Sequence, residues 1–456
     1  MRDLYNLIAE IISYLLKNTN PDFYRRYKSR TKKKADEERE FLLQKIPALF
    51  DRETKGIAEI VKPEDLLPDL KRVYEQCQGE NNQGTLLYLV EKLDEALQNQ
   101  LRREFESRQG EHTEECLNSN WNTYKVGLLP RCGCRWERKH RGSQHRDRID
   151  NFLHNFLLID YGNWAEWRIE HHFLSASLFA RAEGEGKLRV AFSPFKKEDD
   201  FLISEYETQE EQRFSIEYTG QADADADYVK KRIDQAAEKK ADVLLLPEML
   251  GNTEMENRIS EYLQNPGWLN RGSPPALIVL PTVWSGHTNT ACLLDGTGGV
   301  VCRQEKQYSF SLRESVLEDI RPDRTVHLIH GEGVGRIVIL ICKDFLTEDY
   351  LSRVLADLKA TLLLIPSYST GYHDFEMKLG KLLAEDCCAV WVNACSVVRG
   401  SAPEDRRMGM VLRTGKARLK SGEHVRCFGC PEECTARDCT GDCLEVCELY
   451  YGREVS

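Results

Sequence analysis

Three side chains of this sequence carry chemistry that becomes useful when they meet in one place: the carboxylate of Glu248, the amine of Lys306 and the thiol of Cys342. A thiol can attack an electrophilic carbon, a carboxylate can move protons, and an ammonium can stabilise an oxyanion. The set therefore suits acyl transfer from an amide or a nitrile. Taken singly, each residue has an ordinary role, since buried thiols, Pro-Glu pairs and solvated lysines are common.

The order and context of the three residues favour the chemical interpretation. Glu248 ends the apolar run LLLPE, Lys306 ends VVCRQEK, and Cys342 ends IVILIC. Functional groups of α/β proteins tend to lie at the carboxyl ends of strands. We therefore expect the three side chains to converge in one pocket, although they are far apart in the sequence.

From residue 188 onward, short apolar runs alternate with segments of helical spacing. Strands are expected at LRVAF, ADVLLLPE, 276–280, around the Asp295-Gly296 turn, and at 337–341, 361–365 and 389–392, with helices over 227–239 and 373–386. This alternation predicts an α/β architecture with strands buried under outer helices. The charged insert 196–218 has two alternating halves that predict a hairpin. A surface decoration is its more usual role, and an active-site flap is the alternative.

The remaining chain predicts two further modules. A chain of 456 residues is longer than a single hydrophobic core usually organises. Residues 1–184 are expected to form a mainly helical N-terminal module, 185–415 the catalytic domain, and 416–456 a small Cys-rich tail. The basic stretches 25–34 and 132–148 carry no known fold signature of nucleic-acid binding, so a solvated face is favoured over nucleic-acid binding.

Composition narrows the class of protein. Hydrophobic residues make up 41% and charged residues 30%, and no apolar run approaches the ~20 residues that span a bilayer. Asp3 and Glu10 interrupt any signal-peptide pattern at the first helix. Sixteen cysteines in a long chain without an export signal indicate a reducing cytoplasm. The net charge of -11 argues against long-range attraction of a polyanionic substrate.

The segments PEML, RQEKQY and GRIVILICKDF resemble, in this order, the Glu, Lys and Cys motifs of the nitrilase superfamily of carbon-nitrogen hydrolases. The resemblance covers about half the chain, roughly residues 185–400, and continues through ATLLLIPSYSTG and WVNAC, where Pro366, Ser367 and Asn393 fit the pattern. It implies an αββα sandwich, a catalytic Glu-Lys-Cys trio, catalysis without a metal or organic cofactor, and self-association of sandwiches across a helix surface.

Members of this family often use a second glutamate after the lysine, and here SLRESVLED offers Glu314 and Glu318, of which Glu314 is preferred. Lys343 stands where the family often has an aromatic residue, and its backbone N–H is a second candidate oxyanion donor. Its side chain hints at an acidic group on the substrate, but it could instead lower the thiol pKa or point to solvent. The expected substrate contacts are Tyr308, Lys343, Phe345, Tyr368 and His373, without a ranking.

The tail concentrates six cysteines: Cys427, Cys430, Cys434, Cys439, Cys443 and Cys447. Structural zinc held by these thiolates would fold a segment with almost no apolar core, while disulfides and free thiols are the alternatives. A looser set consists of His112, Cys116, Cys132 and Cys134, with His140 in reserve. For this set, buried thiols remain the default interpretation.

These observations together indicate a self-associating hydrolase that acts on a non-peptide carbon-nitrogen bond of a small molecule through a Cys-bound acyl intermediate. The alternative from another class is a nitrilase-fold scaffold or sensor subunit of a larger assembly, with hydrolysis secondary or lost. Transfer of the acyl group to an amine instead of water also remains open, and the residues do not name the substrate.

Overall fold

The computed structural model describes the chain except for residues 52, 55, 138–146, 196–198, 210, 266, 268–272, 314, 383–384, 399–406, 415–424, 430–442 and 452–456. The chain divides into two compact units. The first contains Met1–Gly133, Arg138–Glu166 and Ala356–Leu358, and the second contains Cys134–Glu137, Trp167–Leu355 and Lys359–Ser456. Among the described helices, none combines the length and apolarity needed to cross a membrane.

The first unit is mainly helical. Its elements are α1 (Arg2–Asn18), α2 (Pro21–Lys28), α3 (Lys32–Lys45), α4 (Pro63–Gly79), α5 (Gln83–Ala96), α6 (Gln98–Ser107), β1 (His112–Thr113), α7 (Trp121–Tyr124), and the antiparallel pair β2 (Val126–Pro130) and β3 (Phe156–Asp160). Helix α1 buries its apolar stripe, with Leu4, Ile8 and Leu15 fully covered. In the basic stretch, Arg25 pairs with Asp22 and Arg30 with Glu38, which fits a role within the unit's own surface.

The boundaries of the second unit differ from the expected ones at both ends. Strand β4 (Arg168–Phe173), assigned by sequence to the N-terminal module, pairs in parallel with β15 (Thr325–Gly331). In the expected tail, β20 (Val425–Gly429) pairs with β19 (Arg407–Leu412), and β21 (Glu445–Tyr450) pairs with β5 (Lys187–Phe192). These strands are rich in charged residues, His or Cys and lack a clear apolar pattern, so periodicity does not predict them. The described tail strands therefore complete the sheets and do not form a separate extension.

Two larger sheets form the centre of the second unit. One has the order β4-β15-β16-β17-β18-β19-β20, with β16 (Gly335–Ile339), β17 (Leu362–Ser367) and β18 (Cys388–Asn393). The other has the order β10-β11-β9-β8-β5-β21, with β10 (Val283–Ser285), β11 (Thr288–Asp295), β9 (Leu277–Val279) and β8 (Val243–Leu245), and β12 (Val300–Glu305) also pairs with β11. The sheets face each other, because Phe192 of β5 and Phe428 of β20 place their ring centroids 5.1 Å apart.

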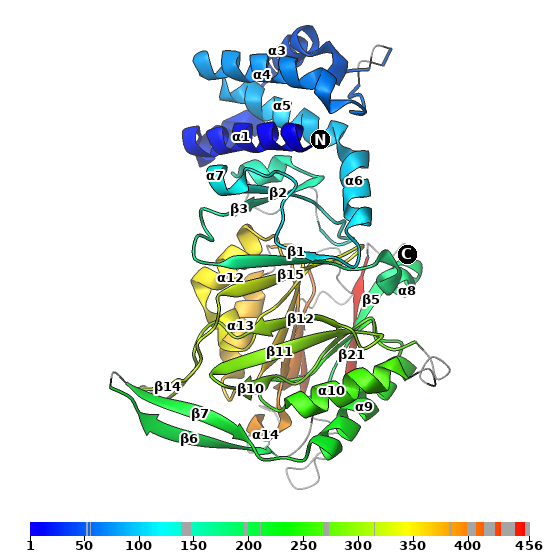
Figure 1. Ribbon diagram of the computed structural model, residues 1–456, viewed down its shortest axis with the longest axis vertical. Coiled ribbons are helices and arrows are strands. Elements are labelled where there is room, and N and C mark those ends of the chain that lie inside the picture. Colours follow the sequence, from blue (N-terminus) through cyan, green and yellow to red (C-terminus); the bar gives the residue numbers. More distant parts are fainter. Residues whose placement is uncertain are drawn as a thin grey trace. The chain divides into compact units, whose positions relative to one another are not determined.

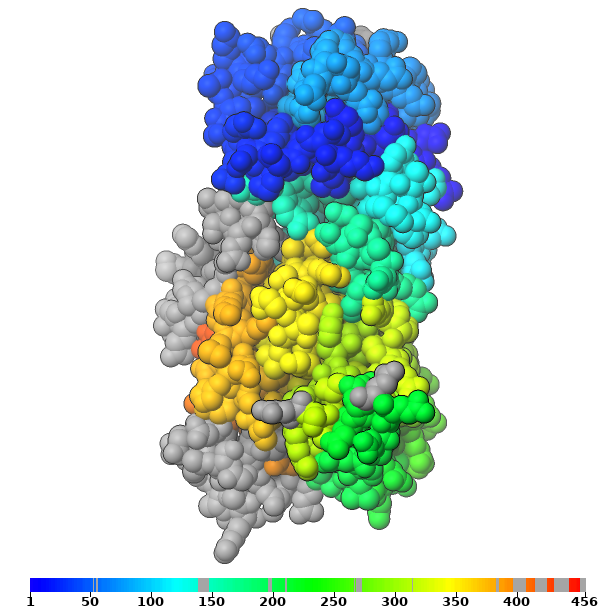
Figure 2. All heavy atoms as spheres, turned by 90° about the vertical axis from the view of Figure 1, so that its left-hand side faces the viewer, coloured from blue at the N-terminus to red at the C-terminus, as the bar shows by residue number. Residues whose placement is uncertain are grey.

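Helices cover the sheets from outside (Figure 1). Helices α9 (Ala222–Glu238) and α10 (Thr253–Gln264) pack on the sheet that contains β8 and β9, and Val229 and Ile259 lie in the same core as Leu244 and Ile278. Helix α13 (Tyr372–Lys381) packs on the other sheet through Phe375, whose ring centroid lies 5.2 Å from that of Trp391. In Figure 2, α13 and α12 (Glu348–Ala356) are the yellow to orange segments on the visible face. Short helices α8 (Ala180–Glu185), α11 (Lys343–Leu346) and α14 (Cys395–Val398) complete the unit.

The charged insert forms the predicted hairpin. Strands β6 (Phe201–Glu207) and β7 (Gln212–Tyr218) are antiparallel, and β14 (Val316–Glu318) pairs in parallel with β7 and antiparallel with β13 (Ser311–Arg313). The hairpin is more than a surface decoration, because Phe214 and Ile216 share a small core with Met249 and Val316. It therefore packs against the segments that follow Glu248 and precede Glu318.

A glycine lies where the two sheets come close together. A Cβ atom on Gly409 of β19 would lie 2.2 Å from a ring carbon of Phe192. We expect Gly409→Ala to lower the free energy of unfolding by about 1–3 kcal/mol, because the core must shift to admit the methyl group. Chemical denaturation would measure it. Gly184→Ala in α8 is the control, since nothing lies within 4 Å of its Cβ position, and an equal effect of both substitutions would contradict this packing.

Candidate active site

Glu248, Lys306 and Cys342 lie together in the second unit. The Nζ atom of Lys306 donates a hydrogen bond of 2.8 Å to Oε1 of Glu248, and the thiol of Cys342 donates one to the Glu248 carboxylate. The exposed fractions of the three residues are 0%, 1% and 2%. The structure thus joins three segments that are widely separated in the sequence, as their positions after strands predict.

Consecutive residues at the end of strand β17 accept hydrogen bonds from the backbones of the nucleophile and the acid. The backbone N–H of Cys342 donates to the carbonyl of Pro366 (3.0 Å), and that of Glu248 donates to the carbonyl of Ser367 (3.4 Å). The next backbone N–H, that of Tyr368, donates to Oε2 of Glu248 (2.9 Å). The Pro-Ser turn noted in the sequence therefore holds the backbones of both reactive residues in place.

Cys342 adopts a backbone conformation that few residues tolerate. It lies between β16 and α11 with φ of 45° and ψ of -98°. Such strain costs on the order of 1–3 kcal/mol and persists where the surrounding structure enforces it, often at functional sites. The sharp turn required for Lys343 to offer its backbone N–H beside the thiol is thus present.

Glu318 is the second glutamate at this site. Its Oε2 accepts hydrogen bonds from Nζ of Lys306 (2.5 Å) and from the backbone N–H of Phe310 (3.1 Å). The sequence favoured Glu314, which lies outside the described residues. The alternation of side chains along β14 explains why Glu318 points inward, because Val316 and Glu318 share the buried face of the strand.

Two polar residues missed by the sequence analysis complete the cluster. Nδ2 of Asn289 donates to Oε1 of Glu248 (2.9 Å) and to Oε1 of Glu318 (3.1 Å). Its Oδ1 accepts from the hydroxyl of Thr282 (2.6 Å), which fixes the orientation of the amide. The available signal was weak, because Asn289 lies between two threonines at the start of β11 and does not stand out from its neighbours. Asn289 separates and orients two carboxylates that would otherwise repel each other.

Burial and charge set the protonation of the trio. Burial raises the pKa of the Cys342 thiol well above its usual value, the Glu248 carboxylate raises it further, and Lys306 opposes both. Burial also raises the pKa of Glu248, with Lys306 opposing. Burial alone would lower the pKa of Lys306, but Glu248 and Glu318 outweigh it, and the net shift is upward. The resting nucleophile is therefore a thiol beside a charged ammonium, because the lowering of its pKa by Lys306 does not outweigh burial and the Glu248 charge.

Asp344 ties the nucleophile turn to the segment after Lys306. Its Oδ1 accepts from the backbone N–H groups of Gln307 and Tyr308, each at 2.9 Å. Burial raises the pKa of Asp344 to about 8, while Lys306 and these backbone donors oppose the shift. This side chain fixes the distance between the ends of β12 and β16, and hence between Lys306 and Cys342.

The expected substrate contacts fall into different environments. Tyr368 lies beside Glu248, and its hydroxyl donates to Asp199 near the insert (2.7 Å). Tyr308 is half-buried, with its ring centroid 5.5 Å from that of Tyr350. Both remain candidates.

The other three candidates differ. Phe345 is fully buried and stacks on Phe375, with 6.0 Å between the ring centroids. It therefore belongs to the core and does not fit the expected role of a substrate contact. His373 is exposed on α13 against Tyr372, with ring centroids 4.1 Å apart. Lys343 is half-buried next to the nucleophile.

The predicted cysteine sites remain largely untested. Cys430, Cys434, Cys439 and His140 lie outside the described residues. Cys427 lies on β20 with its thiol 3.7 Å from a carboxylate oxygen of Glu376, whereas Cys447 lies on β21 in the other sheet. The described residues include groups of side chains close enough together to share a metal ion. None of these groups contains Cys116, Cys132, Cys134, Cys427, Cys443 or Cys447.

Comparisons with known proteins found neither a matching family model nor a matching curated relative. Solved structures do match. An amidase from Nesterenkonia sp. aligns with a TM-score of 0.38 and 14% identity, covering 59% of this chain and 92% of that one. A mutant of the amidase from Nesterenkonia sp. AN1, with acrylamide added at its active-site cysteine, aligns with a TM-score of 0.32 and 15% identity over 45% and 78% of the chains. A cysteine-to-alanine mutant of the Nesterenkonia AN1 amidase, described as from the nitrilase superfamily, aligns with a TM-score of 0.33 and 15% identity over 46% and 77%.

Proposed function

We propose that the protein is a hydrolase of a small-molecule carbon-nitrogen bond, in an amide or a nitrile, with a nitrilase-like αββα sandwich as its catalytic domain. The observation that carries the proposal is the buried cluster in which the Glu248 carboxylate contacts both the Cys342 thiol and the Lys306 ammonium. A thiol, a base and an oxyanion donor are the minimum set for acyl transfer through a thioester.

In the first half-reaction on an amide, Glu248 takes the proton of the Cys342 thiol while the sulfur attacks the carbonyl carbon. The ammonium of Lys306 and the backbone N–H of Lys343 stabilise the oxyanion. Glu248 then gives its proton to the leaving nitrogen, the carbon-nitrogen bond breaks, and the amine departs from a thioester. Glu318 and Asn289 keep Lys306 and Glu248 in place.

In the second half-reaction, Glu248 accepts a proton from water while the water oxygen attacks the thioester carbon. The carbon-sulfur bond breaks, the proton returns to the sulfur, and the carboxylic acid leaves. Because only 2% of the Cys342 surface is exposed, the site suits a small acyl group and not a polypeptide. The resemblance to the nitrilase motifs also implies self-association, which stays a prediction, as does zinc in the tail.

Intact mass spectrometry after exposure to a panel of amides and nitriles tests the proposal. We expect the mass to rise by that of the acyl group, with the modification mapped to Cys342. Cys388→Ala, which removes another fully buried thiol of this unit, should leave the adduct unchanged. If a folded protein with free Cys342 gains no adduct from any member of the panel, the scaffold alternative is favoured.

A further inference from the structure

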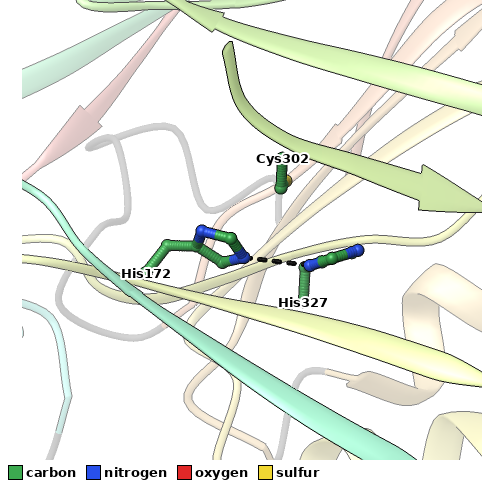
Figure 3. A group of neighbouring side chains, drawn as sticks. All are labelled: His172, Cys302 and His327. Atoms are coloured by element: carbon green, nitrogen blue, oxygen red, sulfur yellow. Dashed lines mark hydrogen bonds between the residues drawn. The ribbon is translucent and has the colours of Figure 1, made fainter. Parts of the chain in front are cut away.

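A second group of reactive side chains lies in the second unit and takes no part in the mechanism above. It consists of His172 on β4, Cys302 on β12 and His327 on β15 (Figure 3). Their exposed fractions are 4%, 5% and 9%. One ligand atom from each residue lies within 4.8 Å of those of the other two.

The pairing of the strands explains why these side chains meet. Strands β4 and β15 are parallel neighbours, with Glu170 opposite His327 and His172 opposite Ile329. Residues opposite each other, and residues two apart, point to the same face, so Glu170, His172 and His327 share one face. Strand β12 belongs to the other sheet and brings Cys302 toward this face.

The donor set matches the preferences of zinc. Two imidazoles and a thiolate are usual Zn²⁺ ligands, and bonds of roughly 2.0–2.3 Å place tetrahedral ligand atoms roughly 3–4 Å apart. Nε2 of His172 lies 2.9 Å from Nδ1 of His327, so a small separation of the rings would admit the ion. A carboxylate is also close, because Oε2 of Glu170 lies 3.3 Å from Nδ1 of His327.

We propose that His172, Cys302 and His327 bind a structural Zn²⁺ ion, with the carboxylate of Glu170 as the fourth ligand. On binding, the zinc-sulfur bond forms and the thiol proton of Cys302 passes to solvent. The inference does not depend on the proposed hydrolase function, because none of these residues belongs to the Glu248 cluster.

The position of Cys302 gives this site a consequence for the catalytic strand. Cys302 and Gln304 lie on β12, Lys306 directly follows its last residue, and all three side chains are buried. Gln304 already braces β12 on β15, since it donates to the Thr325 carbonyl (3.0 Å) and accepts from the His327 N–H (3.1 Å). Zinc at Cys302 would fasten the same strand to both β15 and β4, about 13 Å from the catalytic lysine.

Metal analysis and cobalt substitution test the site in the full-length protein. We expect about one zinc ion per chain at this site, and Co²⁺ replacing it should give the visible and near-ultraviolet bands of a tetrahedral ion with one thiolate. Cys302→Ser should remove the thiolate band, and His327→Ala should lower metal content further. The melting temperature of the unmodified protein should fall with chelator and recover with added Zn²⁺, a response that both variants should lose.

Matched controls come from β15 and from β11, the neighbour of β12. His330→Ala alters the pair His171 and His330, whose ring nitrogens lie 3.1 Å apart, and Cys292→Ser alters a buried thiol of the neighbouring strand β11. Both should keep the metal and its spectrum. The proposal is overturned if the unmodified protein binds neither Zn²⁺ nor Co²⁺ at micromolar concentration. Retention of the thiolate band in Cys302→Ser, with loss in Cys427→Ser, would place the metal in the tail and would overturn it as well.

Discussion

Replacing Cys342 with alanine is expected to lower turnover of the hydrolysed amide or nitrile by about 10⁴-fold or more, because the covalent route disappears with the sulfur. The fold should be retained. The substitution deletes one buried atom and leaves the backbone donation from Cys342 to Pro366 intact. Steady-state kinetics and a melting curve of the same preparation measure the two effects.

The control for this variant is Cys388→Ala. Cys388 is also fully buried, and burial raises the pKa of its thiol to about 11. It differs from Cys342 in lacking the glutamate and lysine beside it, so its removal should leave turnover within a factor of a few. Full activity of Cys342→Ala would refute the proposed nucleophile, and equal loss in both variants would point to damage of the fold.

Lys306→Met is expected to impair both stability and activity. The ammonium of Lys306 neutralises two buried carboxylates, those of Glu248 and Glu318. Removing one partner from a buried ionic group costs about 3–5 kcal/mol, because the remaining charge is left uncompensated. Turnover should fall as well, since the oxyanion loses its cationic donor. Chemical denaturation and kinetics would measure both, and Lys230→Met, which breaks an exposed pair with Asp227, should change stability by less than about 1 kcal/mol.

The loss in Lys306→Met should depend on pH. Without the ammonium, the pKa of Glu248 in the folded state rises further above its unfolded value. A carboxyl shifted in this direction favours folding fully below its unfolded pKa of about 4.3, and this contribution is lost as pH rises through the folded pKa. The deficit should therefore be smallest in acid and grow toward neutral pH. Adding Glu318→Gln should restore part of the stability at neutral pH, and a deficit independent of pH would contradict the charge explanation.

The sequence predicts those parts of the fold in which the apolar residues follow a clear periodic pattern. The apolar runs at β5, β8, β16, β17 and β18 are buried between the outer helices and the facing sheet, and they appear as strands. Strands β4, β20 and β21 carry His, Cys and charged residues, and only their partners in the sheets make them strands. β4 and β21 pair with strands far away in the sequence, and the short β20 has no clear apolar pattern, so the expected boundaries at 184 and 416 missed them.

The same distinction applies to the site. Glu248, Lys306 and Cys342 could be named because each follows a recognisable strand and motif. The choice of Glu318 depends on the register of β14, which the insert strand β7 helps to set through the pairing of Glu318 with Phe214. Asn289 could not be named, because its role arises only when the two carboxylates are already on either side of it.

The pairing of β5 with β21 also bears on the order of events during synthesis. Strand β5 lies early in the second unit, after β4 and α8, yet its antiparallel partner is the last described strand, with Lys187 opposite Tyr450. One edge of β5 therefore stays unpaired until nearly the whole second unit has been synthesised. The helical first unit, built mostly from contacts between nearby segments, can become compact long before this. The nascent chain thus passes through a stage with a folded amino-terminal unit and an open sheet edge, which is the period when it depends most on protection from aggregation.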